Sequence, residues 1–341
     1  MRRERWERTS HALRSGKAAR LLPWLASGAG ALLALVGWLA FRPIEPGPLI
    51  TPARPARSYM EAVARIQAIE AGLDPAAMHP KCGVRFLTHG QAQPRAIVLV
   101  HGYTDCPQQF AALGQQFYDL GYNVLIVPLP RHGLADRLNE AHGELTVPEL
   151  AAYAGEMVDI AQGLGQHTTM MGHSLGANVT AWAAQTRADL DLAVPISPAF
   201  GFEQVPTAIT RPAIHRTLLL PNTYEWWDPS QQAAIEPDHN YPRYFVHTLA
   251  NILWLGQAVQ TAAGREAPAA GRILVVTNAN DHAVNNLLTA HVVSLWRRHG
   301  ADVTTFEFPA ELGLDHDVIE PYPPSDLTPM VYEKLIELVA H

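Results

Sequence analysis

The chain has 341 residues, of which 48% are hydrophobic and 17% charged, and its formal net charge at pH 7 is −7. This composition is typical of a globular protein with one or two domains, and the chain contains no internal repeats. Residues 1–20 carry seven Lys or Arg against two Glu, a net +5 that leaves −12 on the rest, and so acidic a body argues against nucleic acid as a partner.

A membrane-spanning helix is predicted over residues 21–41, which contain no charged residue. As a helix this segment would span roughly 30 Å, the thickness of a bilayer core. Trp24 and Trp38 lie near its ends, and the basic residues before it place the N-terminus in the cytoplasm and the rest of the chain outside. A cleaved secretory signal is the alternative, although its apolar region is normally only about 7–15 residues long. We therefore favour an uncleaved signal anchor, and in either case we expect the remaining chain to be exported.

A linker follows, because residues 42–57 contain five prolines, a density that favours an extended spacer over packed structure. Ser58 and Glu61 then form a capping box for a helix predicted over residues 59–71. Residues 58–341 are predicted to form one folded domain.

Cys82 and Cys106 are the only two cysteines of the chain. In an oxidising compartment they permit one disulfide, which would close a loop of about 24 residues and stabilise the fold by roughly 3 kcal/mol. Two free thiols are the alternative, and export favours the bridge.

From residue 84 onward, short apolar segments alternate with helical ones. Strands are predicted over residues 84–88, 96–100, 124–127, 168–171, 192–196, 273–277 and 303–308, and helices over 107–120, 147–164, 177–186, 287–299 and 327–340. This alternation predicts an α/β fold with a doubly wound, mostly parallel sheet covered by helices on both faces. In such sheets, ligands bind at the carboxyl ends of the strands.

The alternation is interrupted by residues 199–271, which are rich in Trp, Tyr and Pro. A structureless loop of this length is improbable, so we predict an inserted helical cap over the site. An ordinary crossover helix with long surface loops is the alternative. Trp226 and Trp227 are candidates for lining an apolar substrate site, although they could equally belong to the core of the cap.

The most informative motif is Gly172-His173-Ser174-Leu175-Gly176, a G-x-S-x-G sequence between a predicted strand and a predicted helix. Its two glycines let the chain turn sharply, so that the Ser174 hydroxyl is exposed at the turn. A serine hydroxyl is a weak nucleophile, and it requires a base to take its proton and an acid to orient that base.

Candidates for both groups follow later strands in the order Ser, Asp, His. Asp281 comes just after the strand at 273–277, and His316 comes after the strand at 303–308. His282 is a reserve candidate for the base, but choosing it leaves the acid unassigned. We therefore predict a triad of Ser174, Asp281 and His316.

Stabilising a tetrahedral oxyanion requires two backbone N–H donors, for which Leu175 and Tyr103 are the candidates. No H-E-x-x-H motif, paired C-x-x-C motif or phosphate-binding glycine loop occurs in the sequence. Neither a cofactor nor a metal is therefore expected.

Five segments in order carry a resemblance to a known family: LVHGYTDCPQQF, PLPRHG at 128–133, GHSLG, NANDHAV and LDHDVIEP. Together they resemble the α/β-hydrolase superfamily over roughly residues 84–340, and most closely the bacterial carboxylesterases and monoacylglycerol-lipase-like serine hydrolases. The resemblance implies an α/β-hydrolase fold in which Ser174 is the nucleophile, His316 the base and Asp281 its orienting acid. It also implies that Tyr103 and Leu175 provide the backbone donors.

We expect a membrane-anchored, exported serine hydrolase that cleaves carboxylic esters through an acyl-enzyme intermediate. An acyltransferase with the same triad and a catalytically inactive binding module are the alternatives. The expected partners are a small-molecule or lipid-derived ester and the membrane. The expected location is a bacterial inner membrane, crossed once, with the catalytic domain on the periplasmic side, or secretion if the signal is cleaved. The oligomeric state is left open.

Overall fold

The computed structural model describes residues 30, 34–39, 41–42, 49–320 and 327–340, and it divides into a unit of residues 1–43 and a unit of residues 44–341. The predicted basic segment and most of the predicted transmembrane segment lie outside the described residues. Within the part of the chain that is described, no helix has both the length and the apolar character needed to cross a membrane.

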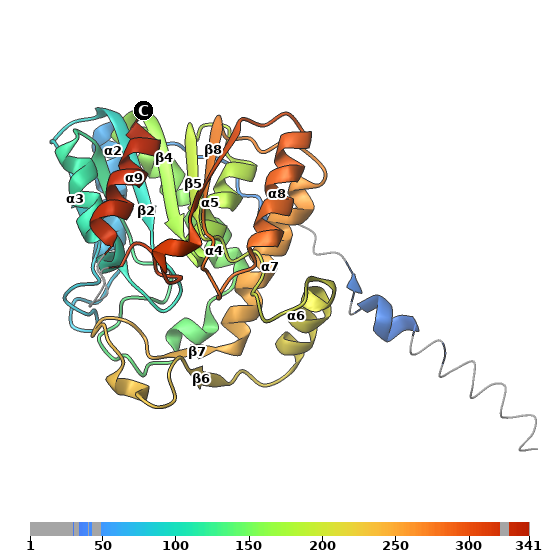
Figure 1. Ribbon diagram of the computed structural model, residues 1–341. Coiled ribbons are helices and arrows are strands. Elements are labelled where there is room, and N and C mark those ends of the chain that lie inside the picture. The colour runs from blue at the N-terminus through green and yellow to red at the C-terminus, as the bar shows by residue number, and fades with distance from the viewer. Residues whose placement is uncertain (1–29, 31–33, 40, 43–48, 321–326, 341) are drawn as a thin grey trace, which may run out of the picture. The chain divides into compact units, whose positions relative to one another are not determined.

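A seven-stranded sheet forms the centre of the larger unit (Figure 1). Its strands are β1 (Arg85–Leu87), β2 (Gln93–Val100), β3 (Asn123–Ile126), β4 (Gly165–His173), β5 (Leu192–Ile196), β8 (Arg272–Asn278) and β9 (Val303–Phe308). Their order across the sheet is β1-β3-β2-β4-β5-β8-β9, and only β1 pairs antiparallel with its neighbour in this sheet. The prediction of a mostly parallel sheet is therefore confirmed.

The helices are α2 (Tyr59–Ala71), α3 (Ala111–Asp119), α4 (Val147–Leu164), α5 (Leu175–Thr186), α6 (Thr210–Leu219), α7 (Val246–Ala263), α8 (Asn286–Arg298) and α9 (Thr328–Ala340). Helix α2 begins where its capping residue predicts, because the Ser58 hydroxyl accepts the Glu61 N–H at 3.2 Å. The helix predicted over residues 107–120 begins as a 3₁₀ turn, Pro107–Phe110, and continues as α3.

The sheet separates two hydrophobic cores, one on each face. Along β2, Ala96, Val98 and Val100 face one core while Ile97 and Leu99 face the other, as the two-residue period of a strand requires. Helices α3 and α9 cover the second core, whereas α2, α4, α5, α7 and α8 contribute to the first. Because both faces of the sheet are buried, the sequences of its strands are continuous apolar runs.

The long insertion between β5 and β8 contains two kinds of structure. The first part carries α6 and a small antiparallel pair, β6 (Tyr224–Trp226) and β7 (Arg243–Phe245). The last part is α7, whose buried Leu255, Ala258 and Val259 join the main core. Because α7 packs against α5 as a crossover helix, the cap elements end near residue 245, short of the predicted boundary at 271.

Part of the predicted linker packs against the body of the protein. Leu49 and Ala56 are buried, and the Ala56 N–H donates to the Asp159 carbonyl at 2.8 Å. The Arg54 N–H donates to the Asp159 carboxylate at 2.9 Å, and Arg187 donates to the same oxygen at 2.6 Å. Residues 49–57 therefore contact the body of the protein at a few points, because this buried ion pair offers partners to their backbone, while residues 50–55 and 57 stay exposed.

Candidate active site

Ser174 lies in a sharp turn between β4 and α5, with φ 54° and ψ −110°. A positive φ at a residue other than glycine costs on the order of 1–3 kcal/mol. The turn requires both flanking glycines: a Cβ on Gly172 would lie 2.2 Å from the Gly176 carbonyl oxygen, and a Cβ on Gly176 would lie 2.1 Å from that of Val100. The Ser174 N–H donates to the Ile196 carbonyl at 3.0 Å, which ties the strained turn to β5.

The structure brings together the three side chains predicted to form the triad. Ser174 Oγ–H donates to Nε2 of His316 at 2.9 Å, and Nδ1–H of His316 donates to Oδ2 of Asp281 at 2.8 Å. Because Asp281 can only accept a hydrogen bond when ionised, it holds the ring hydrogen on Nδ1 and leaves Nε2 as a proton acceptor. The arrangement is that of a general base aimed at a hydroxyl nucleophile.

Asp281 is held as an anion by its surroundings. Its side chain is fully buried, and its Oδ1 accepts the N–H groups of Ala283 at 2.9 Å and Val284 at 3.2 Å. Burial alone would raise the pKa of Asp281, but the hydrogen bond and charge of His316 and the two backbone donors outweigh it and lower that pKa.

The surroundings of His316 stabilise its protonated form. Burial lowers the pKa of His316, but the Asp281 hydrogen bond and the charges of Asp317, Asp281 and Asp315 outweigh it, so that the pKa lies above its ordinary value of 6.5. The two flanking aspartates therefore act on the base through their charge. His282, the reserve candidate, is exposed and faces Glu203 at 3.3 Å.

His173, inside the G-x-S-x-G motif, belongs to the candidate site, and the sequence did not reveal this. It is fully buried, and its Nε2–H donates to the His316 carbonyl at 2.9 Å. Burial, assisted by the charge of His316, lowers the pKa of His173 to about 3, so this ring stays neutral at physiological pH. His173 thus holds the backbone of the proposed base against the strand that carries the nucleophile.

The loop that carries His316 is also held from β8. The Asn278 side chain donates to the carbonyls of Leu314 at 2.8 Å and Asp315 at 2.9 Å, and the Asn280 side chain donates to Leu314 at 3.1 Å. These amides satisfy buried carbonyl groups directly before the histidine. They fix the position of its backbone without contacting its ring.

The loop after β2 lies beside the nucleophile. A Cβ on Gly102 would lie 3.7 Å from the Ser174 Cβ, and the Gly102 N–H is already bonded to Gln109 at 2.9 Å. Tyr103 follows Gly102, and its hydroxyl accepts the Phe245 N–H at 3.1 Å from the cap. Leu175 is the first residue of α5. The roles of Tyr103 and Leu175 as oxyanion donors stay predictions.

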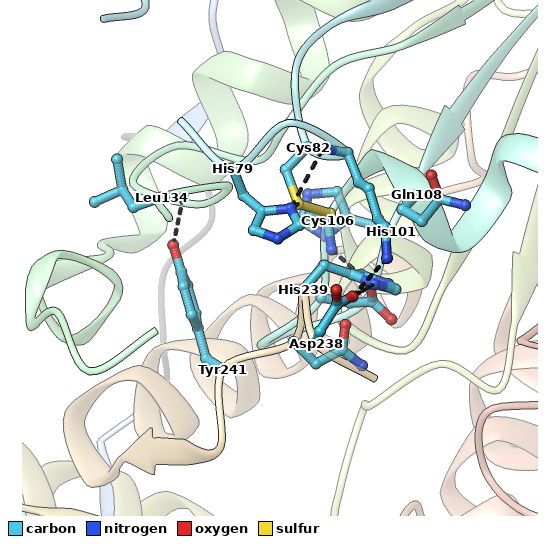
Figure 2. The surroundings of a disulfide bond; sticks show 12 residues. His79, Cys82, His101, Cys106, Gln108, Leu134, Asp238, His239 and Tyr241 are labelled. Carbon is cyan, nitrogen blue, oxygen red and sulfur yellow. Dashed lines mark hydrogen bonds and ion pairs between the residues drawn. A yellow bond between two sulfur atoms is a disulfide. The ribbon is translucent and has the colours of Figure 1, made fainter. Parts of the chain in front are cut away.

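Cys82 and Cys106 form a disulfide that joins the chain before β1 to the end of this loop (Figure 2). From the cap, Trp227 donates its indole N–H to the Thr104 hydroxyl at 3.0 Å, next to Tyr103. Trp226 instead makes an edge contact with Tyr224 within the cap. Whether either indole lines the substrate site stays a prediction.

A cavity of about 550 Å³ opens on the cap, and it contains none of the three triad residues. Its lining residues are Glu140, Glu144, Asn222, Thr223, Tyr224 and Phe245. It is therefore not assigned as the site of an acyl group.

Comparison with known proteins gives a family and a fold. Residues 91–307 match the family described as serine aminopeptidase, S33. Among solved structures, the chain is similar to the monoacylglycerol lipase of Paleococcus ferrophilus, with 17% identity over 75% of this chain and 96% of that one and a TM-score of 0.58. A soluble variant of monoglyceride lipase from Saccharomyces cerevisiae, in complex with a substrate analogue, is 12% identical over 75% of this chain and 90% of that one, also with a TM-score of 0.58.

A third similar structure is reported for the metagenome-derived lipolytic enzymes LipS and LipT, with 18% identity over 77% of this chain and 99% of that one and a TM-score of 0.53. The chain has no significant sequence match among curated proteins. At these identities the structural likeness shows a shared α/β-hydrolase fold.

Proposed function

The chain belongs to the serine aminopeptidase S33 family of α/β hydrolases, and from this premise we propose that it is a serine hydrolase that cleaves carboxylic esters through an acyl-enzyme intermediate. The observation that carries the proposal is the continuous hydrogen-bonded chain from Ser174 through His316 to Asp281. A hydroxyl with a base on one side and an orienting anion behind it is the arrangement that nucleophilic acyl transfer needs.

In this mechanism His316 accepts the Ser174 proton on Nε2 while Oγ attacks the acyl carbonyl carbon. The N–H groups of Tyr103 and Leu175 stabilise the oxyanion of the tetrahedral intermediate. His316 then gives the proton to the leaving alcohol, which departs and leaves an ester on Ser174. Water, deprotonated by His316, attacks this ester, and collapse of the second intermediate releases the acid and restores the serine. Asp281 stays ionised throughout.

The substrate that we propose is an ester with an apolar acyl portion, such as a lipid-derived ester. Its support comes from the cap, which places the Trp227 ring against Tyr244 and anchors it on the loop beside the nucleophile. The similar monoacylglycerol and monoglyceride lipases agree with such a substrate.

The location that we propose is the inner membrane, with residues 21–41 as an uncleaved anchor and the catalytic domain on the periplasmic side. The charge pattern of residues 1–41 supports this orientation. A disulfide also agrees with an oxidising compartment. Protease added to spheroplasts should degrade the catalytic domain, and protection of that domain would contradict the orientation.

The activity is tested on the full-length chain with p-nitrophenyl esters of increasing acyl length, aminoacyl p-nitroanilides and a fluorophosphonate probe. We expect turnover of the esters, with a preference for longer acyl chains, and labelling of Ser174. Ser174→Ala should abolish turnover and labelling without unfolding, whereas Ser294→Ala, an exposed serine on α8, should change neither. Ester hydrolysis that survives in Ser174→Ala would refute the proposal, and turnover of the anilides alone would replace esters by peptides as substrates.

A further inference from the structure

A second group of buried polar side chains lies beside the proposed active site and takes no part in its mechanism. Asp105 lies two residues after Tyr103 in the loop after β2, His239 lies in the turn before β7, and Glu320 lies four residues after His316. Their exposed fractions are only 4%, 8% and 6%. The group thus joins three separate segments: the loop after β2, the cap and the loop of the proposed base.

This group consists of two carboxyl groups and one imidazole. Burial, the charge of Glu320 and a hydrogen bond with the Glu320 side chain raise the pKa of Asp105 well above its ordinary range. Among the described residues, His239 is the only basic group in ion-pairing range of either carboxylate. Buried carboxylates are normally paired with cations or bound to a metal.

The distances from His239 to the two carboxyl groups suit a shared ion better than hydrogen bonds. His239 Nε2 lies 3.4 Å from Glu320 Oε1 and 3.7 Å from Asp105 Oδ1. In the described part of the chain, neither ring nitrogen of His239 makes a hydrogen bond, nor does Glu320 Oε2. Two ligand atoms on one tetrahedral zinc ion, with bonds of 2.0–2.2 Å, lie about 3.3–3.6 Å apart.

The side chains are held in place by the surrounding structure. Asp105 Oδ1 accepts the Cys106 N–H at 2.6 Å, and the disulfide of Cys106 anchors that backbone. Figure 2 shows His239 reaching from the cap toward the loop of Cys106. Its second ring nitrogen, Nδ1, lies 3.5 Å from Asp238, and a carboxylate behind the ring is the usual orienting partner of a metal-bound histidine.

We propose that Asp105, His239 and Glu320 bind one divalent metal ion, and that this ion is zinc. One imidazole nitrogen and two carboxylate oxygens are a ligand set that Zn²⁺ accepts, with a fourth position left for water. Cys106 is close to the group, but its sulfur is used in the disulfide. The ion joins the cap to the two loops that flank Ser174, and its role is to hold them in place.

The test uses the full-length chain, purified without a histidine tag, freed of metal with a chelator and kept free of reductant. Calorimetric titration with Zn²⁺ should show one site, and elemental analysis after desalting should find one zinc per chain. Glu320→Gln and His239→Gln should each weaken binding by about 100-fold or more, since loss of an outer-shell partner already costs 10–100-fold. Zinc should raise the melting temperature of the wild type but not that of these variants.

The matched control is Glu203→Gln, which removes a carboxylate that faces the exposed His282 and should leave zinc binding unchanged. X-ray absorption of the zinc-loaded wild type should show a single imidazole among oxygen ligands, and this measurement needs no variant to fold. His173, His316 and Asp317 form another set of potential ligands, so a spectrum with two imidazoles would overturn the proposal. Wild-type zinc affinity in folded Glu320→Gln and His239→Gln, or no zinc binding by the wild type, would also overturn it.

Discussion

Replacing Asp281 by Asn tests the geometry of the proposed active site, because the two residues have nearly the same shape. The native Oδ1 accepts two backbone N–H groups, from Ala283 and Val284, while Oδ2 accepts Nδ1–H of His316. An Asn side chain offers one oxygen and one NH₂ group, so it can satisfy only one of these two sides.

The hydrogen bonds decide which way the amide faces. Turning its NH₂ toward the backbone would leave two buried N–H donors without an acceptor, at about 1–3 kcal/mol each. Turning it toward His316 leaves only one donor, Nδ1–H of the ring, without an acceptor. The oxygen should therefore stay with Ala283 and Val284, and the NH₂ should face Nδ1 of His316. The ring must then carry its hydrogen on Nε2, where it can no longer accept the Ser174 proton.

The expected loss in kcat/KM at neutral pH is about 10⁴-fold, or roughly 5 kcal/mol of transition-state stabilisation. The assay is p-nitrophenyl ester hydrolysis by wild type and Asp281→Asn across a pH series, with thermal melts to show that both are folded. Because only neutral His316 can act as the base and its pKa is raised, wild-type activity should fall as the pH drops through a value above 6.5. A folded variant that keeps at least a tenth of wild-type activity, with the same fall in activity at low pH, would refute the reasoning.

Three further predictions concern the surroundings of this site. Gly176→Ala should prevent folding, since its methyl group would lie 2.1 Å from the Val100 carbonyl oxygen. The control Gly83→Ala, whose methyl group would lie in open space, should melt like the wild type, and a folded Gly176→Ala protein would contradict the prediction. Reduction of the disulfide, which joins residues 24 positions apart, should lower the free energy of unfolding by about 3 kcal/mol in a denaturant titration, and an unchanged midpoint would count against it. His173→Ala should lower kcat by about 10–100-fold, because the buried His316 carbonyl loses its donor, and steady-state kinetics with a wild-type kcat would exclude that role.

Much of the fold could be predicted from the sequence, because a sheet buried on both faces leaves continuous apolar runs. All seven strands of the central sheet were predicted, and the bounds of β5 and β9 agree with the structure at both ends. The order of the strands, with β3 between β1 and β2, was not predicted, since it depends on which apolar surfaces pack together. The small sheet of the cap was also missed, because β6 and β7 are only three residues each and carry little periodicity.

The residues of the candidate site were likewise predicted only in part from the sequence. Ser174 was recognised because the steric demands of its turn fall on Gly172 and Gly176, two positions away on either side. Asp281 and His316 were found from their order after successive strands. His173 was missed, since nothing in its immediate sequence shows that it donates to a carbonyl 143 positions further along the chain.

What the sequence determined by itself is therefore local: the strands and helices, the strained turn and the chemical types of the reacting groups. Each depends on backbone sterics or on burial over a few neighbouring residues. Only the tertiary structure decided that a hydroxyl, an imidazole and a carboxylate lie within 2.9 Å of their partners, and that Asp105, His239 and Glu320 share one buried site. Such distances arise from the register of parallel strands and the packing of the cap, which no short stretch of sequence encodes.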